Sequence, residues 1–292
     1  MILAHIMLWL TAIIWGSAFV AQSTVTNLLE PNSFNAARFA LATITLTPLL
    51  YLLPHKQDYK TRSLILKGTL LGTILFTGFG FQQPGLLYVS AGDAGFISST
   101  YIVIVPIIGL TFGEKISRDT WIGIIFAVAG LYTLCIGPNF SINHGDFIEL
   151  TGAFFWACHL LLISKLSKQF PPIPLAITQF SSAAILASIS ALLFEQPRLS
   201  HFTQEWLPLL YSSLIALGLA SLFQIMGQKH VSATISALIL SSAAVFAVIS
   251  DWLFLGTSLS SKSYIGCGLI LIGLSITIIR FKRKNKIIKK AA

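Results

Sequence analysis

The chain has 292 residues, of which 55% are hydrophobic and 10% are charged, and its net charge is +9. Soluble domains carry about 25% charged residues, so a water-soluble globular protein is excluded. The high hydrophobicity also excludes a disordered chain. Cys135, Cys158 and Cys267 stand in apolar runs, which predicts neither a disulfide framework nor a zinc site.

Long apolar runs follow one another along the whole chain. A membrane helix needs about 20 mainly apolar residues, and runs that are apolar throughout favour spanning helices over barrel strands. The expected spans, in chain order, are Ile2–Ala21, Ser33–Leu53, Leu64–Leu87, Ala94–Phe112, Thr120–Gly137, Phe147–Lys165, Ile173–Phe194, Trp206–Gly227, Ala233–Leu255 and Ser263–Ile279. The sequence therefore predicts an all-α integral membrane protein with ten transmembrane helices.

The basic residues predict how these spans are oriented. If the N-terminus is cytoplasmic, most of the 19 basic residues fall on the cytoplasmic side, and Arg198 and Lys262 fall outside. This asymmetry is the positive-inside pattern and predicts that both termini are cytoplasmic. The basic tail, residues 281–292, is expected to contact anionic lipid headgroups. Binding of nucleic acid by this tail is a much weaker alternative, so no nucleic-acid partner is expected.

The chain also repeats itself at an offset of about 142 residues. The segment FQQPGLLYVSA at 81–91 matches FQIMGQKHVSA at 223–233, Trp15 matches Trp156, and Arg38-Phe39 matches Gln179-Phe180. The repeat predicts two five-span halves, residues 1–137 and 146–280. Because five is odd, the halves enter the membrane from opposite sides, and such inverted repeats suit alternating access.

Several of these segments resemble a known family. They are LTAIIWGSAFVAQ, PNSFNAARFALA and YVSAGDAGFISSTYIVIVPIIGLTFGEKIS in the first half, and SALILSSAAVFAVISDWLFLG in the second. Together they resemble the EamA-type transporters of the drug/metabolite transporter superfamily. The resemblance implies two inverted five-helix halves around a central cavity, and transport of amino acids, other small metabolites or drugs. The chain departs from the family at Ala243-Ala244, where a Glu-Pro pair is common, and at Thr257, the counterpart of Glu114.

The expected function is secondary active transport, as an exporter or exchanger, of small organic metabolites such as amino acids, in a bacterial inner membrane. The driving force is expected to be an ion or proton gradient, counter-transport of substrate, or the substrate's own gradient. No phosphate-binding GxxxxGK[ST] segment or cluster of metal ligands occurs, so neither a cofactor, a metal nor an enzymatic activity is expected. A non-transporting scaffold or receptor and, less favoured, a membrane-embedded enzyme are the alternatives. The oligomeric state is left open.

Polar residues inside the spans are the candidates for the site, because each needs a partner or a wet cavity. Arg38 lies near the start of the second expected span. No acidic residue is found deep in another expected span to neutralise its charge. Its planar guanidinium suits a carboxylate or phosphate. Alternatively, it reaches outward to the interface, to backbone carbonyls and to Glu30. The expected substrate-binding set is Trp15, Arg38, Gln82, Tyr101, Trp156, His159, Gln179 and Gln224.

Each of the other candidates has a structural alternative. His159 could carry a proton or simply bind a neighbouring helix. Gln82 and its repeat counterpart Gln224 bind either substrate or another helix. The aromatic side chains of Trp15, Tyr101 and Trp156 either form a wall for an apolar or cationic substrate or only pack against other helices. Gating is expected at Pro84, Pro106 and Asp251.

Overall fold

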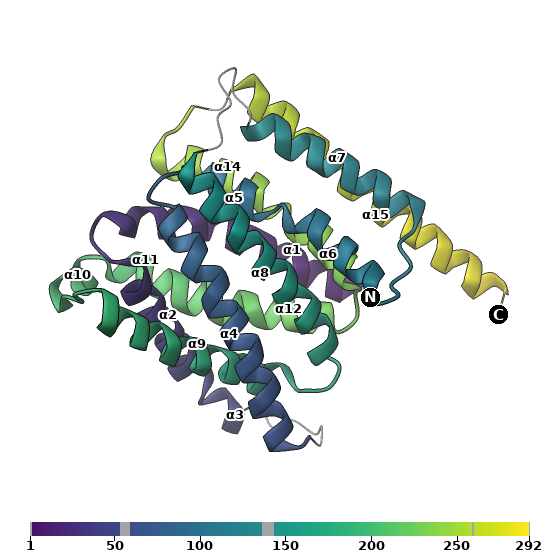
Figure 1. The fold of residues 1–292 in the computed structure, drawn as a ribbon. Helices are drawn as coiled ribbons and strands as arrows, with labels where there is room; N and C mark the ends of the chain where they lie inside the picture. The colour runs from purple at the N-terminus through teal and green to yellow at the C-terminus, as the bar shows by residue number, and fades with distance from the viewer. Residues whose placement is uncertain (1, 53–58, 136–142, 259, 292) are drawn as a thin grey trace.

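In the computed structural model the chain is helical, with no strand among the residues that the structure describes (Figure 1). These are all residues except 1, 53–58, 136–142, 259 and 292, and the side chains of 134–135 and 278–291 are also outside the description. The helices are α1 (Ile2–Thr24), η1 (Val25–Asn27), α2 (Pro31–Leu46), α3 (Leu49–Leu52), α4 (Thr61–Gly85), α5 (Ala91–Ser98), α6 (Tyr101–Thr111), α7 (Arg118–Cys135), α8 (His144–Leu166), α9 (Pro172–Phe194), α10 (Leu199–Gln204), α11 (Trp206–Leu210), η2 (Tyr211–Leu219), α12 (Ala220–Gln228), α13 (Ala233–Leu240), α14 (Ala243–Leu255) and α15 (Ser261–Ala291).

Seven stretches of the described chain are long and apolar enough to cross a membrane. They are Ile2–Asn27, Thr61–Gly85, Ala91–Thr111, His144–Leu166, Pro172–Phe194, Trp206–Gln228 and Ala233–Leu255. The other three expected spans are not among them. The second is divided at Thr47-Pro48 into α2 and α3, since proline cannot donate a helical hydrogen bond. The fifth corresponds to α7, and the tenth has a shorter apolar part, Ser261–Thr277. The expected ends at Leu53 and Gly137 lie outside the described residues.

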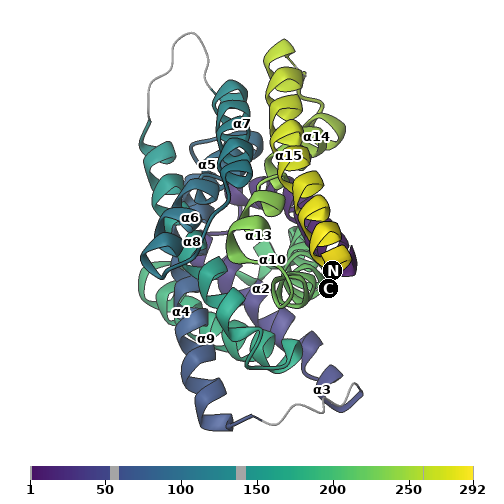
Figure 2. The ribbon, with the colours of Figure 1, turned by 90° about the vertical axis from the view of Figure 1, so that its right-hand side faces the viewer.

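Helices from the two halves of the chain pack against one another (Figure 2), and their buried side chains form the main hydrophobic core. Helix α1 packs chiefly against α12 and α14, whereas α8 packs chiefly against α4, with α5 and α6 beside it. Helix α2 packs on α9. The segments 1–137 and 146–280 therefore interlock, because each contributes a helix to the surroundings of the other.

Two of the apolar stretches are interrupted at serines. The repeated Val-Ser-Ala segment begins a helix in both places, because Ser90 accepts a hydrogen bond from the Asp93 amide and Ser232 accepts one from the Ile235 amide. Each helix then ends and restarts, at Ser99 between α5 and α6 and at Ser241 between α13 and α14. The Ser99 hydroxyl lies 3.5 Å from the Ser241 carbonyl oxygen, so the two interruptions meet.

The expected span Trp206–Gly227 contains a wide turn. Residues Tyr211–Leu219 form a π-helix between α11 and α12. π-Helical segments are rare in proteins overall, and those that occur often lie at functional sites. Here the Ala216 carbonyl accepts a hydrogen bond from Trp15 Nε1 at 3.0 Å, and the Tyr211 hydroxyl meets Ser17 Oγ at 2.5 Å. The π-helix thus fastens α1 to the second half of the chain.

Helices α7 and α15 form an antiparallel pair along one edge of the bundle (Figure 1). A Cβ atom on Gly123 would lie 2.7 Å from the Gly273 carbonyl oxygen, and one on Gly130 would lie 2.5 Å from that of Gly266. Glycine lets two helix backbones approach closely in lipid, where apolar side chains gain nothing by leaving the surrounding hydrocarbon. These four glycines explain why the pair holds together.

A carboxylate at the end of α9 caps α2. Glu195 Oε1 accepts hydrogen bonds from the Asn32 amide and side chain at 2.8 and 2.9 Å, and Oε2 accepts them from the Ser33 amide and hydroxyl at 2.7 and 2.6 Å. In return, Glu30 Oε2 accepts a bond from the Gln196 amide at 2.8 Å. Negative charge at a helix N-terminus also stabilises the helix dipole. The helix that carries Arg38 is thereby fixed to α9.

Replacing Glu195 with alanine should cost about 1–2 kcal/mol locally, the usual range for a lost helix cap. We expect the amides of Asn32 and Ser33 to exchange hydrogen about 10-fold faster, measured by mass spectrometry in detergent. Glu205→Ala is the matched control, because the Glu205 carboxylate accepts no hydrogen bond from a described residue. Equal exchange in both variants would contradict the capping role.

Candidate functional site

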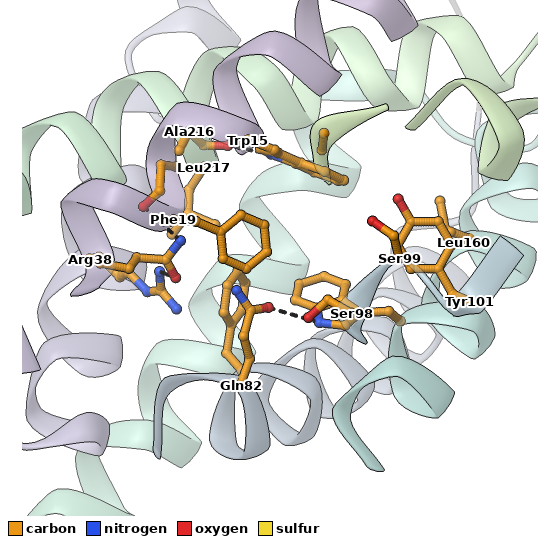
Figure 3. Close-up of a pocket in the computed structure, with 15 residues that line it drawn as sticks. Trp15, Phe19, Arg38, Gln82, Ser98, Ser99, Tyr101, Leu160, Ala216 and Leu217 are labelled. Atoms are coloured by element: carbon orange, nitrogen blue, oxygen red, sulfur yellow. Dashed lines mark hydrogen bonds between the residues drawn. The ribbon is translucent and has the colours of Figure 1, made fainter. Parts of the chain in front are cut away.

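A cavity lies inside the bundle, where helices of the two halves of the chain meet (Figure 3). Its volume is about 600 Å³, counting the space open at its mouth. Its wall comes from α1, α2, α4, α5, α6, α8, η2 and α14, so both halves of the chain contribute. The wall residues are Trp15, Ala18, Phe19, Gln22, Arg38, Phe79, Gln82, Ser98, Ser99, Tyr101, Trp156, Leu160, Ala216, Leu217 and Ala243. Most of them are apolar or aromatic. The polar groups are few, which is typical of a site for a small organic molecule.

Arg38 is the charged residue of this wall. It is only 1% exposed, and it donates hydrogen bonds to Gln22 Oε1 at 2.7 Å and to Asn35 Oδ1 at 2.6 Å. The guanidinium carbon lies 3.8 Å from the centre of the Phe79 ring. All of these partners are neutral, and the Arg38 Nε atom is buried with no hydrogen-bond partner. Arg38 therefore neither reaches outward nor pairs with Glu30, and it presents an unneutralised cation to the cavity.

Aromatic rings surround the same space. Trp156 makes edge-to-face contact with Phe79 at 4.6 Å and lies 6.3 Å from the Trp15 ring. Trp156 Nε1 donates a hydrogen bond to Gln82 Oε1 at 2.9 Å, which holds the Gln82 amide at the wall. Figure 3 shows Arg38 on one side of the cavity and Tyr101 and Ser99 on the other. The cavity thus has a cationic side and aromatic walls.

The remaining expected binding residues lie behind this wall. His159 Nε2 and Gln179 Oε1 are 3.0 Å apart, and both residues are buried. Gln224 is also buried, and both polar atoms of its side chain lack a hydrogen-bond partner among the described residues. None of the three is a wall residue. His159 shares a helix face with Trp156, but only Trp156 reaches the cavity.

The residues expected to gate the site lie outside its wall as well. Pro84 lies one residue before the end of α4. The amide of Leu86, two residues after Pro84, donates a hydrogen bond to the carbonyl of Gln82, two residues before it. Pro106 lies within α6, which continues to Thr111. The interruption of this span is at Ser99, seven residues earlier in the chain. Asp251 is half-buried near the end of α14.

The sequence analysis missed three polar residues. Gln22 and Asn35 hold Arg38, but amides near span ends carry no signal that separates them from interfacial residues. The third is Glu149, which is fully buried. No acidic residue was expected deep in another span, and Glu149 lies five residues from the start of α8, where the packing of other helices buries it. Glu149 is the third residue of the expected span Phe147–Lys165, but α8 begins earlier, at His144, and the end of α4 covers Glu149.

Comparison with known proteins gives one consistent result. The model of the EamA-like transporter family matches residues 2–136 and 143–279. The chain is 31% identical over 278 residues to an uncharacterized transporter of Archaeoglobus fulgidus, covering 95% of this chain and 86% of that protein. It is 26% identical to the uncharacterized inner membrane transporter YedA of Escherichia coli K12, covering 90% and 86%.

The fold is also that of a solved crystal structure, with a TM-score of 0.78 and 17% identity over 94% of this chain and 96% of the other. The named relatives are transporters rather than enzymes, and the seven apolar stretches make the chain a multi-pass membrane protein. The chain belongs to the EamA-like transporter family.

Proposed function

We propose that this protein is a secondary active transporter, working as an exporter or exchanger, of small organic metabolites that carry a carboxylate. The observation that supports this most directly is Arg38, a buried cation on the cavity wall whose hydrogen bonds go only to neutral amides. A buried charge without an opposite charge is unfavourable by several kcal/mol. A carboxylate that enters the cavity removes this penalty and accepts hydrogen bonds from the guanidinium fork.

The rest of the wall narrows the substrate class. Trp15, Phe79, Tyr101 and Trp156 offer ring surfaces, whereas the hydroxyls of Ser98 and Ser99 are among the few polar groups. An apolar or aromatic body fits such a wall, and the ring faces can also accept the α-ammonium group of an amino acid by cation–π contact. A second carboxylate does not fit, because Arg38 is the one cation among the described wall residues. We therefore place amino acids with large apolar side chains and related monocarboxylates first among the substrates.

The proposed mechanism is alternating access in two inverted five-helix repeats, with α2, α7 and α15 counted as spans. The interrupted helices support it, because the breaks at Ser99 and Ser241 meet beside the cavity. Helices broken near the middle of the membrane are typical of transporters whose repeats rock about a fixed site. The basic residues support cytoplasmic termini in a bacterial inner membrane.

The first test compares three ligands of nearly equal size and different charge. Phenylacetate, phenylacetamide and phenethylamine are titrated into the purified protein, with tryptophan fluorescence as the readout because Trp15 and Trp156 line the cavity. Phenylacetate is expected to bind at least 10-fold more tightly than the amide, which lacks the charge that Arg38 attracts. The amine is expected not to bind. Equal binding of all three would contradict recognition by Arg38.

The second test measures transport. Proteoliposomes are loaded with unlabelled phenylalanine, tryptophan, glutamate, nucleosides or S-adenosylmethionine, and the entry of the labelled compound is followed with and without a pH gradient. Counterflow is expected for the apolar amino acids. Absence of counterflow for every compound, from protein shown to be folded, would favour a scaffold or receptor instead.

A further inference from the structure

Glu149 is a buried carboxylic acid that the proposed function has not used. It lies on α8, about 7.5 Å along the helix axis from His144 at 1.5 Å per residue. Its exposed fraction is 0%, and Ser98 Oγ donates a hydrogen bond to its Oε2 at 2.9 Å. The other oxygen, Oε1, is buried with no hydrogen-bond partner. An acidic residue inside a membrane protein is costly to bury, so it is a candidate for function.

The elements packed around α8 leave Glu149 without a counter-ion. A Cβ atom on Gly85 of α4 would lie 2.6 Å from Glu149 Oε1, so the carboxyl group lies directly against that helix. The titratable groups on α8 and on the elements around it are His144, Asp146, Cys158, His159 and Lys165 of α8, Arg62 and Lys67 of α4, Tyr88 after α4, Asp93 of α5 and Tyr101 of α6. The structure shows a hydrogen bond to Glu149 from none of these described groups. Helices α12 and α13 carry no charged residue.

Ser98 connects Glu149 to the transport site. The Ser98 hydroxyl is part of the cavity wall and at the same time bonds to the Glu149 carboxyl group. Arg38 is part of the same wall. A buried cation therefore lies in the wall of this cavity, and a buried acid lies behind the same wall, hydrogen-bonded to the wall residue Ser98; no described contact pairs the two charges.

This arrangement relates the charge of Glu149 to the occupancy of Arg38. In the empty cavity, ionised Glu149 and Arg38 sum to zero charge. When a monoanionic carboxylate binds Arg38, the sum becomes negative unless Glu149 accepts a proton. Charges interact strongly over several ångströms where water is scarce, so the neutral combination is favoured.

Resting on the proposed function, we propose that Glu149 takes up one proton for each monocarboxylate bound at Arg38, so that proton and anion cross the membrane together. The proton moves in the same direction as the anion, and the larger of the two gradients sets the direction of net flux. Glu149 is a better proton carrier than His159, because Glu149 bonds to the wall residue Ser98, whereas His159 bonds to Gln179, which is not in the wall. A metal ion is a poor alternative occupant, since the described residues contain no group of three or more His, Cys, Asp or Glu that could hold one.

The experiment measures the binding of phenylacetate to the purified full chain from pH 5.5 to 9 by calorimetry. Phenylacetate stays ionised over this range, as ordinary carboxylic acids titrate near pH 4. In the wild type the apparent affinity should fall by up to 10-fold per pH unit in the alkaline part of the range, because each binding event consumes one proton. The proton that Glu149 takes up comes from the buffer. The heats of binding measured in phosphate and in Tris should therefore differ by the difference between the ionisation enthalpies of the two buffers, for one proton per ligand.

Glu149→Gln should bind phenylacetate with the same affinity at every pH and give equal heats in both buffers. Glu149→Met, a second uncharged replacement of similar length, should behave alike, and Glu149→Asp should restore proton uptake. Glu205→Gln is the matched control, because it removes a partly exposed carboxylate that accepts no hydrogen bond from a described residue. It should follow the wild type.

The outcomes separate this proposal from the one on which it rests. Phenylacetate binding whose pH dependence is equal in the wild type and Glu149→Gln overturns the role of Glu149 alone. Phenylacetate binding that depends on sodium and not on pH also overturns the role of Glu149. Failure of phenylacetate to bind the folded wild type overturns the anion-binding cavity and, with it, this inference.

Discussion

Replacing Arg38 with glutamine is expected to weaken phenylacetate binding about 100-fold, which corresponds to about 2.7 kcal/mol. The glutamine amide still donates a hydrogen bond to Gln22 or Asn35, but the positive charge on the cavity wall is lost. Charge-assisted bidentate bonds to a carboxylate in a dry site are among the strong polar interactions, so the effect on binding is large. Fluorescence titration of the purified variant measures it.

Two further variants show whether the charge or the shape of Arg38 matters. Arg38→Lys keeps the charge but loses the planar fork, and it should bind phenylacetate with intermediate affinity. Arg62→Gln removes an exposed arginine at the start of α4, and it should bind like the wild type. Unchanged binding in Arg38→Gln, with phenylacetate still preferred over phenylacetamide, would place the anion site elsewhere.

Replacing Gly16 with alanine is expected to lower the stability of the protein by about 2 kcal/mol or more, the range found when a tightly packed core is overfilled. A Cβ atom at this position would lie 2.6 Å from the Ala243 carbonyl oxygen and 2.8 Å from the Ala247 amide nitrogen. These are backbone atoms of α14, so the clash is relieved only if α1 and α14 separate. Because Trp15 and Ala243 are in the cavity wall, ligand binding should weaken as well.

Gly80→Ala is the control, because it makes the same chemical change inside a helix. A Cβ atom on Gly80 of α4 would meet nothing within 4 Å. Alanine is favoured over glycine in a helix by about 1 kcal/mol, so this variant should be as stable as the wild type or slightly more stable. Thermal melting in detergent compares the two. A lower melting temperature in Gly80→Ala than in Gly16→Ala would contradict the close approach of α1 and α14.

The positions of most membrane-crossing segments follow from local sequence, because an apolar run of sufficient length is stable as a helix in lipid wherever it lies in the fold. Seven expected spans agree with the structure in position; their ends agree within three residues, except that the first span continues six residues further, to Asn27. The helix starts at Ser90 and Ser232 are local too, since each serine caps the helix that follows it directly.

The sequence was less informative about which side of each helix faces inward. In a soluble helix the apolar stripe marks the buried face, but here both the lipid face and the protein face are apolar. Trp156 and His159 are therefore indistinguishable by spacing, although only Trp156 lines the cavity. The π-helix at Tyr211–Leu219 and the interruption at Ser99 depend in the same way on contacts with other helices.

The sequence by itself determined that this is a membrane protein of the EamA type, that its spans are helices, and that a charge within a span needed explaining. Only the tertiary structure decided what surrounds that charge. It placed Arg38 among neutral amides and an aromatic ring, and it buried Glu149 behind the same wall. The physical reason is that the environment of an ionisable group is set by neighbouring helices, which are distant along the chain. Charge and apolar length are properties of the residues themselves, whereas dielectric and pairing are properties of the packed bundle.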